Sequence, residues 1–287
     1  MIYLSDFHFV SDSAESQYVA GNPKTLCTYY ESFYPFGFFP ARGLRSLEMS
    51  DITILYGGNG SGKTTALNVM ADALHLTRSA QYNRTDFFED YIQMCQFHTL
   101  HAIPRSSLIL TSDDVFDYML TVRAINDDID DRRSDLIRDV RQARRTPFRM
   151  QSLEEYDRLK LTSEARRMTN SQIVRRKLAN NVRTRSNGES AFQMFGEKIR
   201  SDALYLLDEP ENSLSATHQL DLAQFLGDSA RFFNCQFIIA THSPFLLAIP
   251  GARVYDLDSF PVRTRLWTEL ENVRAFYDFF KAHEEEF

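Results

Sequence analysis

Short runs of apolar residues recur along the chain, and several are bounded by glycine, proline or acidic residues. Four of them have the length of a strand and little polar alternation: residues 52–56 (ITILY), 203–209 (ALYLLDE), 237–241 (FIIAT) and 253–257 (RVYDL). Nearly continuous apolar runs are typical of strands buried on both faces of a parallel sheet. Because helical patterns lie between such runs, the chain predicts an α/β fold with a mostly parallel sheet and crossover connections.

The remaining strand and helix patterns are weaker. They predict strands over 1–10 and 108–110 and helices over 64–76 and 271–283. The aromatic-rich stretch 29–39 (YYESFYPFGFF) is interpreted as strand and loop, because Pro35 and Gly37 interrupt it. Its aromatic rings are expected to cover the core, and the pattern does not single out one that would stack on a nucleotide base.

From about residue 120 the pattern becomes helical and polar. A sparse apolar stripe follows at helical spacing: Ile125, Ile129, Leu136, Val140 and Ala143. Thr146 and Pro147 end this stripe, and a second helical pattern over 153–178 carries paired arginines. We interpret the segment as a two-helix arm or a small helical lobe inserted in the α/β fold.

The composition is that of a soluble globular protein. Of the 287 residues, 43 % are hydrophobic and 25 % are charged, and the length suits one large domain or a domain with a sizeable insertion. No window is apolar enough for a membrane span, and the N-terminus lacks a basic stretch followed by an apolar run. We therefore expect a cytoplasmic protein with no membrane partner.

The three cysteines, Cys27, Cys95 and Cys235, are scattered along the chain. An odd number without paired spacing argues against a disulfide framework and fits a reducing compartment. Cys95, His98 and His101 lie close enough in sequence to invite comparison with a metal site, but their spacing does not close a ligand set. No metal site is predicted at these three residues.

Charge is distributed unevenly along the chain. The net charge is −7, yet residues 123–185 contain 17 Lys and Arg against 10 Asp and Glu. This segment therefore has a local charge of +7, so its surface is basic whereas the rest of the chain is acidic.

A glycine-rich stretch, GGNGSGKT, follows the strand predicted at 52–56 and opens the helix predicted over 64–76. It satisfies the P-loop pattern, in which backbone N–H groups and a helix N-terminus surround phosphate oxygens. The lysine contacts the β and γ phosphates in such a loop, and the hydroxyl of the following threonine binds Mg²⁺. The predicted nucleotide-binding residues are Gly57, Gly58, Asn59, Gly60, Ser61, Gly62, Lys63, Thr64 and Thr65.

Two further strand ends carry acid–base groups. Asp208 and Glu209 follow the apolar run LYLL, and His242 follows FIIAT. Parallel sheets present ligand-binding residues at the carboxyl ends of their strands. We expect Asp208 to hold Mg²⁺ together with Thr64, and Glu209 to orient or deprotonate the attacking water. His242 would contact the γ phosphate and keep this water in register with Glu209.

A second phosphate cradle is suggested by residues 185–190, RSNGES, which precede a helical pattern over 190–199. A serine hydroxyl, a glycine N–H and a helix N-terminus are all suited to binding phosphate. The residues concerned are Ser186, Gly188 and Glu189. This segment is similar to the signature loop of ABC-type ATPases, with Asn187 in place of a glycine and Glu189 in place of a glutamine.

With these motifs, residues 5 to about 258 resemble the ABC-type ATPases. The chain looks closest to single-domain ATPases related to the SMC and recombination-repair group, including those of bacterial anti-phage and retron-type systems. The resemblance implies an ABC-type P-loop fold with N-terminal antiparallel strands and an inserted helical arm. It also implies ATP and Mg²⁺ as cofactors and a head-to-tail homodimer, in which the signature loop contacts the ATP of the other subunit.

The resemblance extends to two further segments. Residues 212–215 would form the D-loop, which crosses the dimer interface. The family usually places a Mg²⁺-binding glutamine at the end of a strand between the P-loop and the signature, and the chain offers Asp113 there. Gln93 and Gln96 lie upstream, in a stretch whose pattern is helical.

We expect three parts along the chain. These are an N-terminal ATPase lobe over 1–119, a basic helical arm over 120–184 and a C-terminal ATPase lobe over 185–287. In the ABC group such an insertion carries partner-specific domains, so the arm would bind nucleic acid or an effector protein such as a nuclease. The alternative is a solvated lobe whose arginines pair with nearby acids, among them Asp127, Asp128, Asp130, Asp131 and Glu154.

The predicted activity is ATP hydrolysis gated by dimerisation, in a DNA-related or anti-phage defence system. One alternative is a scaffold in which ATP joins two subunits and a partner performs the output with little turnover. A second is the ATPase subunit of a transporter, which the large charged insertion disfavours. The chain shows neither a paired HxH motif nor a carboxylate cluster outside the ATP site, so no nuclease activity of its own is predicted.

Overall fold

A computed structural model describes residues 1–26, 32–145, 156–177, 187–212 and 214–287. The chain divides into two compact units. One consists of Met1–Phe116 with Asn187–Phe287, and the other is Asp117–Ser186. The first boundary falls inside helix α4 (Ser112–Arg145), whose residues from Asp117 onward belong to the second unit.

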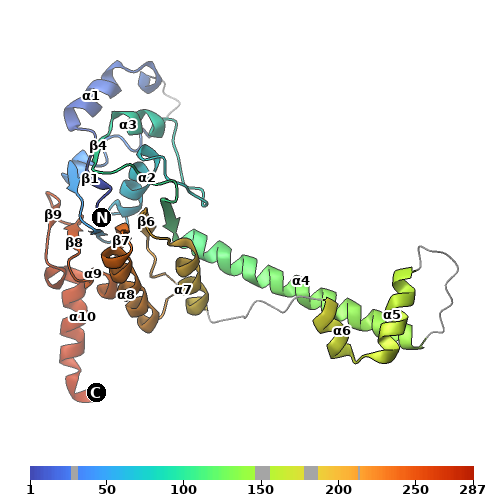
Figure 1. The fold of residues 1–287 in the computed structure, drawn as a ribbon. Coiled ribbons are helices and arrows are strands. Elements are labelled where there is room, and N and C mark those ends of the chain that lie inside the picture. The colour runs from blue at the N-terminus through green and yellow to red at the C-terminus, as the bar shows by residue number, and fades with distance from the viewer. Residues whose placement is uncertain (27–31, 146–155, 178–186, 213) are drawn as a thin grey trace. The chain divides into compact units, whose positions relative to one another are not determined.

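The first unit contains a six-stranded sheet in the order β5-β6-β7-β3-β8-β9. Figure 1 labels β6, β7, β8 and β9 of this sheet. Its strands are β5 (Leu108–Thr111), β6 (Leu204–Asp208), β7 (Gln236–Thr241), β3 (Ile52–Tyr56), β8 (Arg253–Asp256) and β9 (Arg263–Thr264). Each neighbouring pair is parallel except β8 and β9. Every residue of β3, β6 and β7 is buried, as their continuous apolar patterns require. The predicted α/β fold with a mostly parallel sheet is confirmed.

A smaller antiparallel sheet has the order β2-β1-β4. Its strands are β2 (Ser46–Glu48), β1 (Leu4–His8) and β4 (Gln96–Thr99). The fully buried side chain of Gln236 joins this sheet to the parallel one. Its amide nitrogen donates to the carbonyls of Leu4 and Ser50, and its oxygen accepts the N–H groups of Tyr3 and Leu4. The N-terminal antiparallel strands are therefore confirmed, and they share a hydrogen-bond network with the central sheet.

Helices cover both sheets within the first unit. They are α1 (Asp12–Gly21), α2 (Lys63–Ala73), α3 (Phe88–Met94), α7 (Asn187–Lys198), α8 (Ala216–Phe232), α9 (Pro244–Leu247) and α10 (Glu271–Ala282). Short 3₁₀ turns are η1 (Pro23–Leu26), η2 (Pro40–Arg42), η4 (Trp267–Glu269) and η5 (Glu284–Glu286). The main core lies between α2, the two sheets and the aromatic segment, with Leu67, Val69 and Met70 of α2 fully buried.

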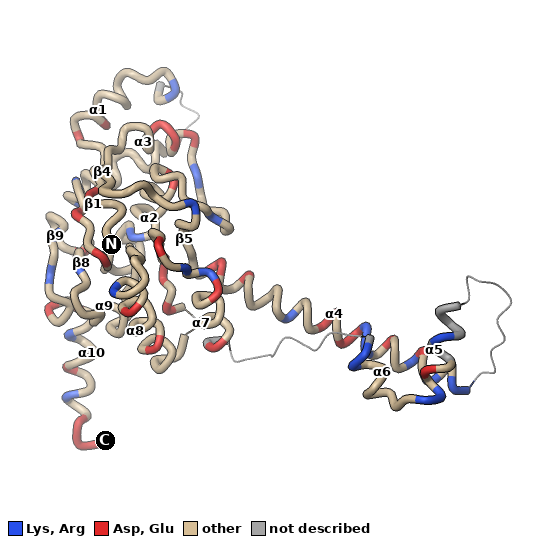
Figure 2. The backbone as a smooth tube through the Cα atoms, viewed as in Figure 1, with Lys and Arg blue, Asp and Glu red and all other residues tan. Residues whose placement is uncertain are grey.

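The second unit contains most of α4 together with α5 (Tyr156–Arg167) and α6 (Asn170–Lys177). Val140, Ala165 and Ile173 form its small core, one residue from each helix. The Arg144 guanidinium donates to the carbonyl of Ala165 in the last turn of α5 and to that of Met168, directly after this helix. Blue segments in Figure 2 show the lysines and arginines that α5 and α6 carry.

Five expectations about elements are wrong. Helix α4 begins at Ser112 rather than near 120, because the Asp114 carboxylate accepts the N–H and hydroxyl of Thr111 and so caps the helix directly after β5. The pattern over 153–178 divides into α5 and α6, because Thr169 and Gln172 form a reciprocal capping box between them. The signature helix α7 begins at Asn187 and not at 190.

The remaining two corrections concern the segments before and after the P-loop. Gln96 begins strand β4, where it pairs with His8, whereas Gln93 is helical as expected. In the aromatic stretch, residues 27–31 lie outside the described residues, and residues 32–39 form turns rather than a strand. Their rings are nevertheless part of the core, since Phe39 is fully buried and Phe36 and Phe38 pack against it.

Candidate active site

Three parallel strands bring the predicted site residues to one edge of the sheet. Strands β6, β7 and β3 are consecutive neighbours, with Asp208 paired to Ala240 and Tyr56 paired to Thr241. The segments that begin at Gly57, Glu209 and His242 therefore leave the sheet side by side. This convergence follows from the strand order, because the carboxyl ends of parallel strands share an edge.

The P-loop lies between β3 and α2 and needs glycine at specific positions. Gly60 and Gly62 have φ values of 77° and 102°, which residues with a side chain rarely adopt. A Cβ at Gly62 would also lie 2.4 Å from the Phe38 ring. The loop is folded around Lys63, whose ammonium donates to the carbonyls of Gly57 and Gly58 at 2.7 and 3.0 Å.

A buried pair of oxygen ligands lies next to Lys63. The Thr64 hydroxyl donates to the Asp208 carboxylate at 3.1 Å. Burial raises the pKa of Asp208 to about 6, although the hydrogen bond from Thr64 opposes the rise. A desolvated carboxylate beside a hydroxyl is suited to a divalent cation, because the cation would restore the charge stabilisation that water no longer provides. The two residues thus fit the Mg²⁺ that an ATP site requires.

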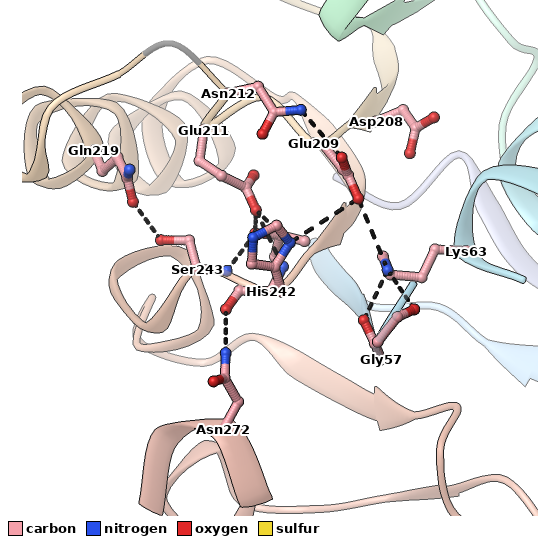
Figure 3. A network of polar contacts seen from close by, with 12 residues as sticks. Gly57, Lys63, Asp208, Glu209, Glu211, Asn212, Gln219, His242, Ser243 and Asn272 are labelled. Atoms are coloured by element: carbon pink, nitrogen blue, oxygen red, sulfur yellow. Dashed lines mark hydrogen bonds and ion pairs between the residues drawn. The ribbon is translucent and has the colours of Figure 1, made fainter. Parts of the chain in front are cut away.

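Glu209 is held in an unusual backbone conformation at the end of β6. Its φ is 47°, and its N–H donates to the carbonyl of Ala240 on β7. One carboxylate oxygen accepts the Asn212 side-chain amide at 3.0 Å, and the other lies 3.8 Å from Lys63 Nζ and 3.9 Å from His242 Nδ1 (Figure 3). The strained backbone places this carboxylate between the P-loop lysine and the histidine.

Glu211 also belongs to this network, and the sequence analysis did not select it. Its side chain is 5 % exposed, and one oxygen accepts the Thr241 hydroxyl and the N–H of His242. The same oxygen lies 3.6 Å from His242 Nδ1, and the other has no hydrogen-bond partner among the described residues. The signal was available as a third acid two positions after Glu209, in the segment DEPE.

His242 is held from a second side by the C-terminal helix. The Asn272 side chain at the start of α10 donates to the carbonyl of His242 at 3.3 Å, and its N–H donates to the Tyr56 hydroxyl. Figure 3 shows Asn272 below His242 and Glu211 above it. The histidine backbone is therefore fixed at both its N–H and its carbonyl.

A cavity of about 370 Å³ opens over the P-loop and is bordered by Phe38, Lys63, Thr64 and Glu209. The Arg42 guanidinium lies 4.9 Å from the centre of the Phe38 ring and donates to the carbonyl of Gly60. Sequence reasoning left the aromatic residue unnamed, since Phe38 is one of several rings and only tertiary packing against Gly62 distinguishes it. A half-buried ring beside a phosphate loop can stack on a nucleotide base.

The profile of the family described as ABC transporter matches residues 45–212, more than half of the chain. The chain belongs to this ABC family. The matched residues include the P-loop and the strand end that bears Asp208 and Glu209. No curated protein matches the sequence. Among the described residues of this ABC protein, none of the helices has the length and apolar character needed to span a membrane.

Solved structures with a similar fold include two kinds of protein. One is a transporter described as of the metal-chelate ABC type in an inward-facing conformation, with 20 % identity, coverage of 81 % of this chain and 80 % of that chain, and a TM-score of 0.37. Another is the Smc head domain of Pyrococcus furiosus bound to the C-terminal domain of ScpA, with 12 % identity, 99 % and 100 % coverage, and a TM-score of 0.43. A third, the SMC head of Thermotoga maritima, has 12 % identity, 74 % and 88 % coverage, and a TM-score of 0.33.

The signature residues of this ABC protein are only partly described. Ser186 lies outside the described residues, as does Ser213 of the predicted D-loop. Asn187 and Gly188 open helix α7, and Glu189 in its first turn is exposed. Helix α7 packs against α8, whereas the P-loop helix α2 packs against β6, β7 and α3. The P-loop and the signature segment are thus attached to different elements of the unit.

Asp113 lies in the first turn of α4, one strand away from Asp208, and it is exposed. Its assignment as a Mg²⁺ ligand stays a prediction. A different acid reaches the P-loop: the carboxylate of Asp258, just after β8, accepts the N–H of Gly58 at 2.8 Å. Sequence reasoning did not select Asp258, because its contact with the P-loop spans 200 residues of chain.

Proposed function

We propose that this ABC protein binds ATP with Mg²⁺ and hydrolyses ATP slowly in a head-to-tail homodimer. The observation that carries the proposal is the convergence of Lys63, Thr64, Asp208, Glu209 and His242 on one edge of the sheet. These groups supply a cation for phosphate, oxygen ligands for a metal ion, and an acid–base pair. Such a combination is what phosphoryl transfer requires.

Each residue has a distinct role in this proposal. Lys63 exchanges its bonds to the P-loop carbonyls for bonds to the β and γ phosphates. Thr64 and Asp208 hold Mg²⁺, which supplies charge neutralisation for the phosphates when it is bound. Glu209 accepts a proton from the attacking water, and His242 positions this water and the γ phosphate. Phe38 stacks on the base.

The second half of the site comes from another subunit. Gly188 and Glu189 lie in the first turn of α7, where the helix N-terminus favours a phosphate, and Ser186 comes directly before this helix in the sequence. Support for their action across an interface comes from the attachment of α7 to α8 rather than to the P-loop helix. Two such halves, related by a two-fold axis, would enclose two ATP molecules.

Mass in solution tests this proposal directly. Glu209→Gln, measured with and without ATP·Mg²⁺, should shift from one chain to two, because ATP binding is retained while water activation is lost. Lys63→Ala is the matched control and should remain one chain at the same ATP concentration. If Glu209→Gln binds ATP but stays monomeric, the homodimer is wrong, and the missing half of the site belongs to a different protein.

The helical arm would connect this ATPase to its partner, in a DNA-related or anti-phage defence system. Arg166, Arg167 and Arg175 of α5 and α6 are exposed, whereas Arg138 of α4 pairs with Asp135. Exposed cations on one lobe favour a phosphate-bearing partner over a purely structural role. Reversal of Arg166, Arg167, Arg175 and Arg176 to glutamate should abolish salt-dependent binding of double-stranded DNA.

The reversal of Arg138 to glutamate is the control for the arm, because this arginine lies on α4, outside the four reversed positions of α5 and α6, and pairs with Asp135. Unchanged DNA binding in the fourfold variant would exclude the arm as a nucleic-acid surface.

The rate of ATP hydrolysis distinguishes the proposed enzyme from the scaffold alternative. A scaffold dimerises with ATP but releases almost no phosphate until a partner is added, whereas the proposed enzyme releases phosphate alone.

A further inference from the structure

Two histidines and an aspartate meet on the small antiparallel sheet, away from the P-loop. Asp6 and His8 lie two residues apart on β1, and Asp6 is paired with His98 on β4. Leu4 and Phe7 of β1 are buried in the core, whereas Asp6 is partly exposed and His8 and His98 are exposed. Residues two apart on a strand share a face, so the three polar side chains gather on the outer face of the sheet.

The three side chains are aimed at one another. Asp6 Oδ1 lies 2.8 Å from His8 Nε2 and 2.7 Å from His98 Nδ1. One ligand atom from each residue falls within 4.8 Å of the other two. Around a tetrahedral Zn²⁺, with bonds of 2.0 to 2.2 Å, neighbouring ligand atoms are about 3.4 Å apart. Small rotations of the exposed imidazoles would therefore place all three atoms around one ion.

The carboxylate of this cluster is also oriented by a hydrogen bond outside it. The Ser5 hydroxyl donates to Asp6 Oδ2 at 2.6 Å and lies 3.1 Å from the carbonyl of His98. The bond leaves Oδ1 turned toward the two histidines. Such outer hydrogen bonds commonly fix the orientation of metal ligands.

We propose that Asp6, His8 and His98 bind a divalent transition-metal ion of the Zn²⁺ class. Two imidazole nitrogens favour Zn²⁺ and its first-row neighbours over Mg²⁺ and Ca²⁺, which prefer oxygen ligands. The site is thus chemically different from the Mg²⁺ site of the nucleotide. Three protein ligands leave a fourth position for water or for a ligand from a bound molecule.

The ion would cross-link β1 and β4 through Asp6 and His98, which are 92 residues apart in the sequence. The cluster also differs from the Cys95, His98 and His101 grouping considered from sequence. The Cys95 thiol is half-buried and donates to the carbonyl of Tyr91, and burial raises its pKa to about 12, which disfavours the thiolate. The ring of His101 contacts Tyr3 and takes no part in the Asp6 cluster.

Calorimetric titration of the nucleotide-free full chain with Zn²⁺ tests the site. His98→Ala is compared with His101→Ala, which removes a nearby exposed histidine outside the cluster. The wild type and His101→Ala should bind the same number of ions, and His98→Ala should lose one site or bind it at least about tenfold more weakly. Asp6→Asn should behave like His98→Ala. Any Zn²⁺ held by the ATP site is common to all the variants and cancels in the comparison.

A second measurement separates ion binding from a folding defect. Zn²⁺ bound to the folded state should raise the Tm of His101→Ala progressively as the Zn²⁺ concentration increases, and it should raise that of His98→Ala less. Co²⁺ in place of Zn²⁺ should show the visible absorption of a low-coordinate site only when His98 is present. Equal Zn²⁺ affinity, stoichiometry and Tm response in the two alanine variants would overturn the proposal and make the cluster a set of hydrogen bonds to Asp6.

Discussion

The P-loop and the signature segment are both predicted to bind phosphate, but they differ in how many contacts their residues make with the rest of the same chain. In the P-loop, Lys63 is 4 % exposed and bonds to two loop carbonyls, and Thr64 bonds to Asp208. At the start of α7, Glu189 is exposed, and the helix is attached to α8. The P-loop lysine is thus buried within its own chain, whereas the side chain of Glu189 is exposed.

This difference separates two kinds of effect that a substitution can have. A change in the P-loop half alters how one subunit binds its nucleotide. A change at the signature should leave binding intact and alter only what two subunits do together. The predictions below use this distinction, and they run from the largest expected effect to the smallest.

Glu209→Gln should reduce ATP hydrolysis by about 100- to 10,000-fold, the range expected when a general base is lost. The amide keeps the size of the side chain, so ATP affinity should change little. Phosphate release under saturating ATP measures the loss, with exposed Glu269→Gln as the matched control. Retention of more than a tenth of the wild-type rate would remove Glu209 from the catalytic role.

Lys63→Ala and Gly188→Asp should each abolish hydrolysis for different reasons. The first should weaken ATP binding about 10- to 150-fold, because a charge-assisted contact is lost. The second should leave ATP binding of the monomer within about twofold, because it places a negative charge only in the partner's site.

Mixing these two variants sharpens the comparison. A head-to-tail heterodimer combines both defects in one site and leaves the other site intact. In an equal mixture about a quarter of all sites would be intact, and hydrolysis should recover accordingly. If the mixture is as inactive as each variant alone, then the P-loop and the signature act within one chain, and the shared site is wrong.

Glu211→Gln should have a moderate effect on hydrolysis. The glutamate accepts two hydrogen bonds near His242, and neutralising it converts charge-assisted bonds to neutral ones. The rate should fall about 5- to 30-fold, with ATP affinity unchanged. Because Glu211 acts through His242, the pH profile of the rate should also shift. A lower rate with an unaltered pH profile would indicate a purely structural role.

Asp208→Asn should stabilise the nucleotide-free fold while it removes the Mg²⁺ dependence. Burial raises the pKa of Asp208 to about 6, so the folded state retains a proton that the unfolded state has lost. Stability therefore falls as pH rises from about 4 to 6, and the penalty is complete above that range. At pH 8 the variant should gain about 2 to 3 kcal/mol in the free energy of unfolding.

Urea denaturation at pH 4 and pH 8 measures this last effect. The difference between Asp208→Asn and the wild type should be small at pH 4 and large at pH 8. Exposed Asp113→Asn is the control, since Asp113 lies in the first turn of α4 and its removal should give no such gain in stability at pH 8. A pH-independent gain would mean that desolvation of the carboxylate is not its cause.

The parts that could be predicted from sequence are those whose signal is local. The buried strands are nearly continuous apolar runs, and the P-loop is a contiguous motif between a strand and a helix. Given a parallel sheet, Asp208, Glu209 and His242 could be placed at a common edge before their mutual distances were known. Their roles in catalysis stay predictions.

What could not be predicted depends on contacts between distant parts of the chain. Phe38 is distinguished by its approach to Gly62, and Asp258 by its bond to Gly58. Neither contact leaves a pattern at helical or strand spacing. The cluster of Asp6, His8 and His98 escaped for the same reason, since local spacing drew attention to Cys95 and His101 instead. The start of α4 is fixed by the cap that Asp114 provides, and the sequence alone does not distinguish Asp114 from the adjacent Asp113.

The side-chain amide of Gln236 on β7, which bonds to the backbone of β1 and of Ser50, has a consequence for how the first unit opens. Its oxygen and nitrogen together hold the backbone of Tyr3, Leu4 and Ser50 in a fully buried setting. If β1 detached, the buried Gln236 amide would lose its hydrogen bonds to Tyr3 and Leu4, and an unpaired buried polar group is costly. The small sheet should therefore not unfold separately from the rest of the unit. In hydrogen–deuterium exchange the amide of Leu4, near the chain terminus, should be protected as strongly as those of β7 and should exchange only when the whole unit unfolds.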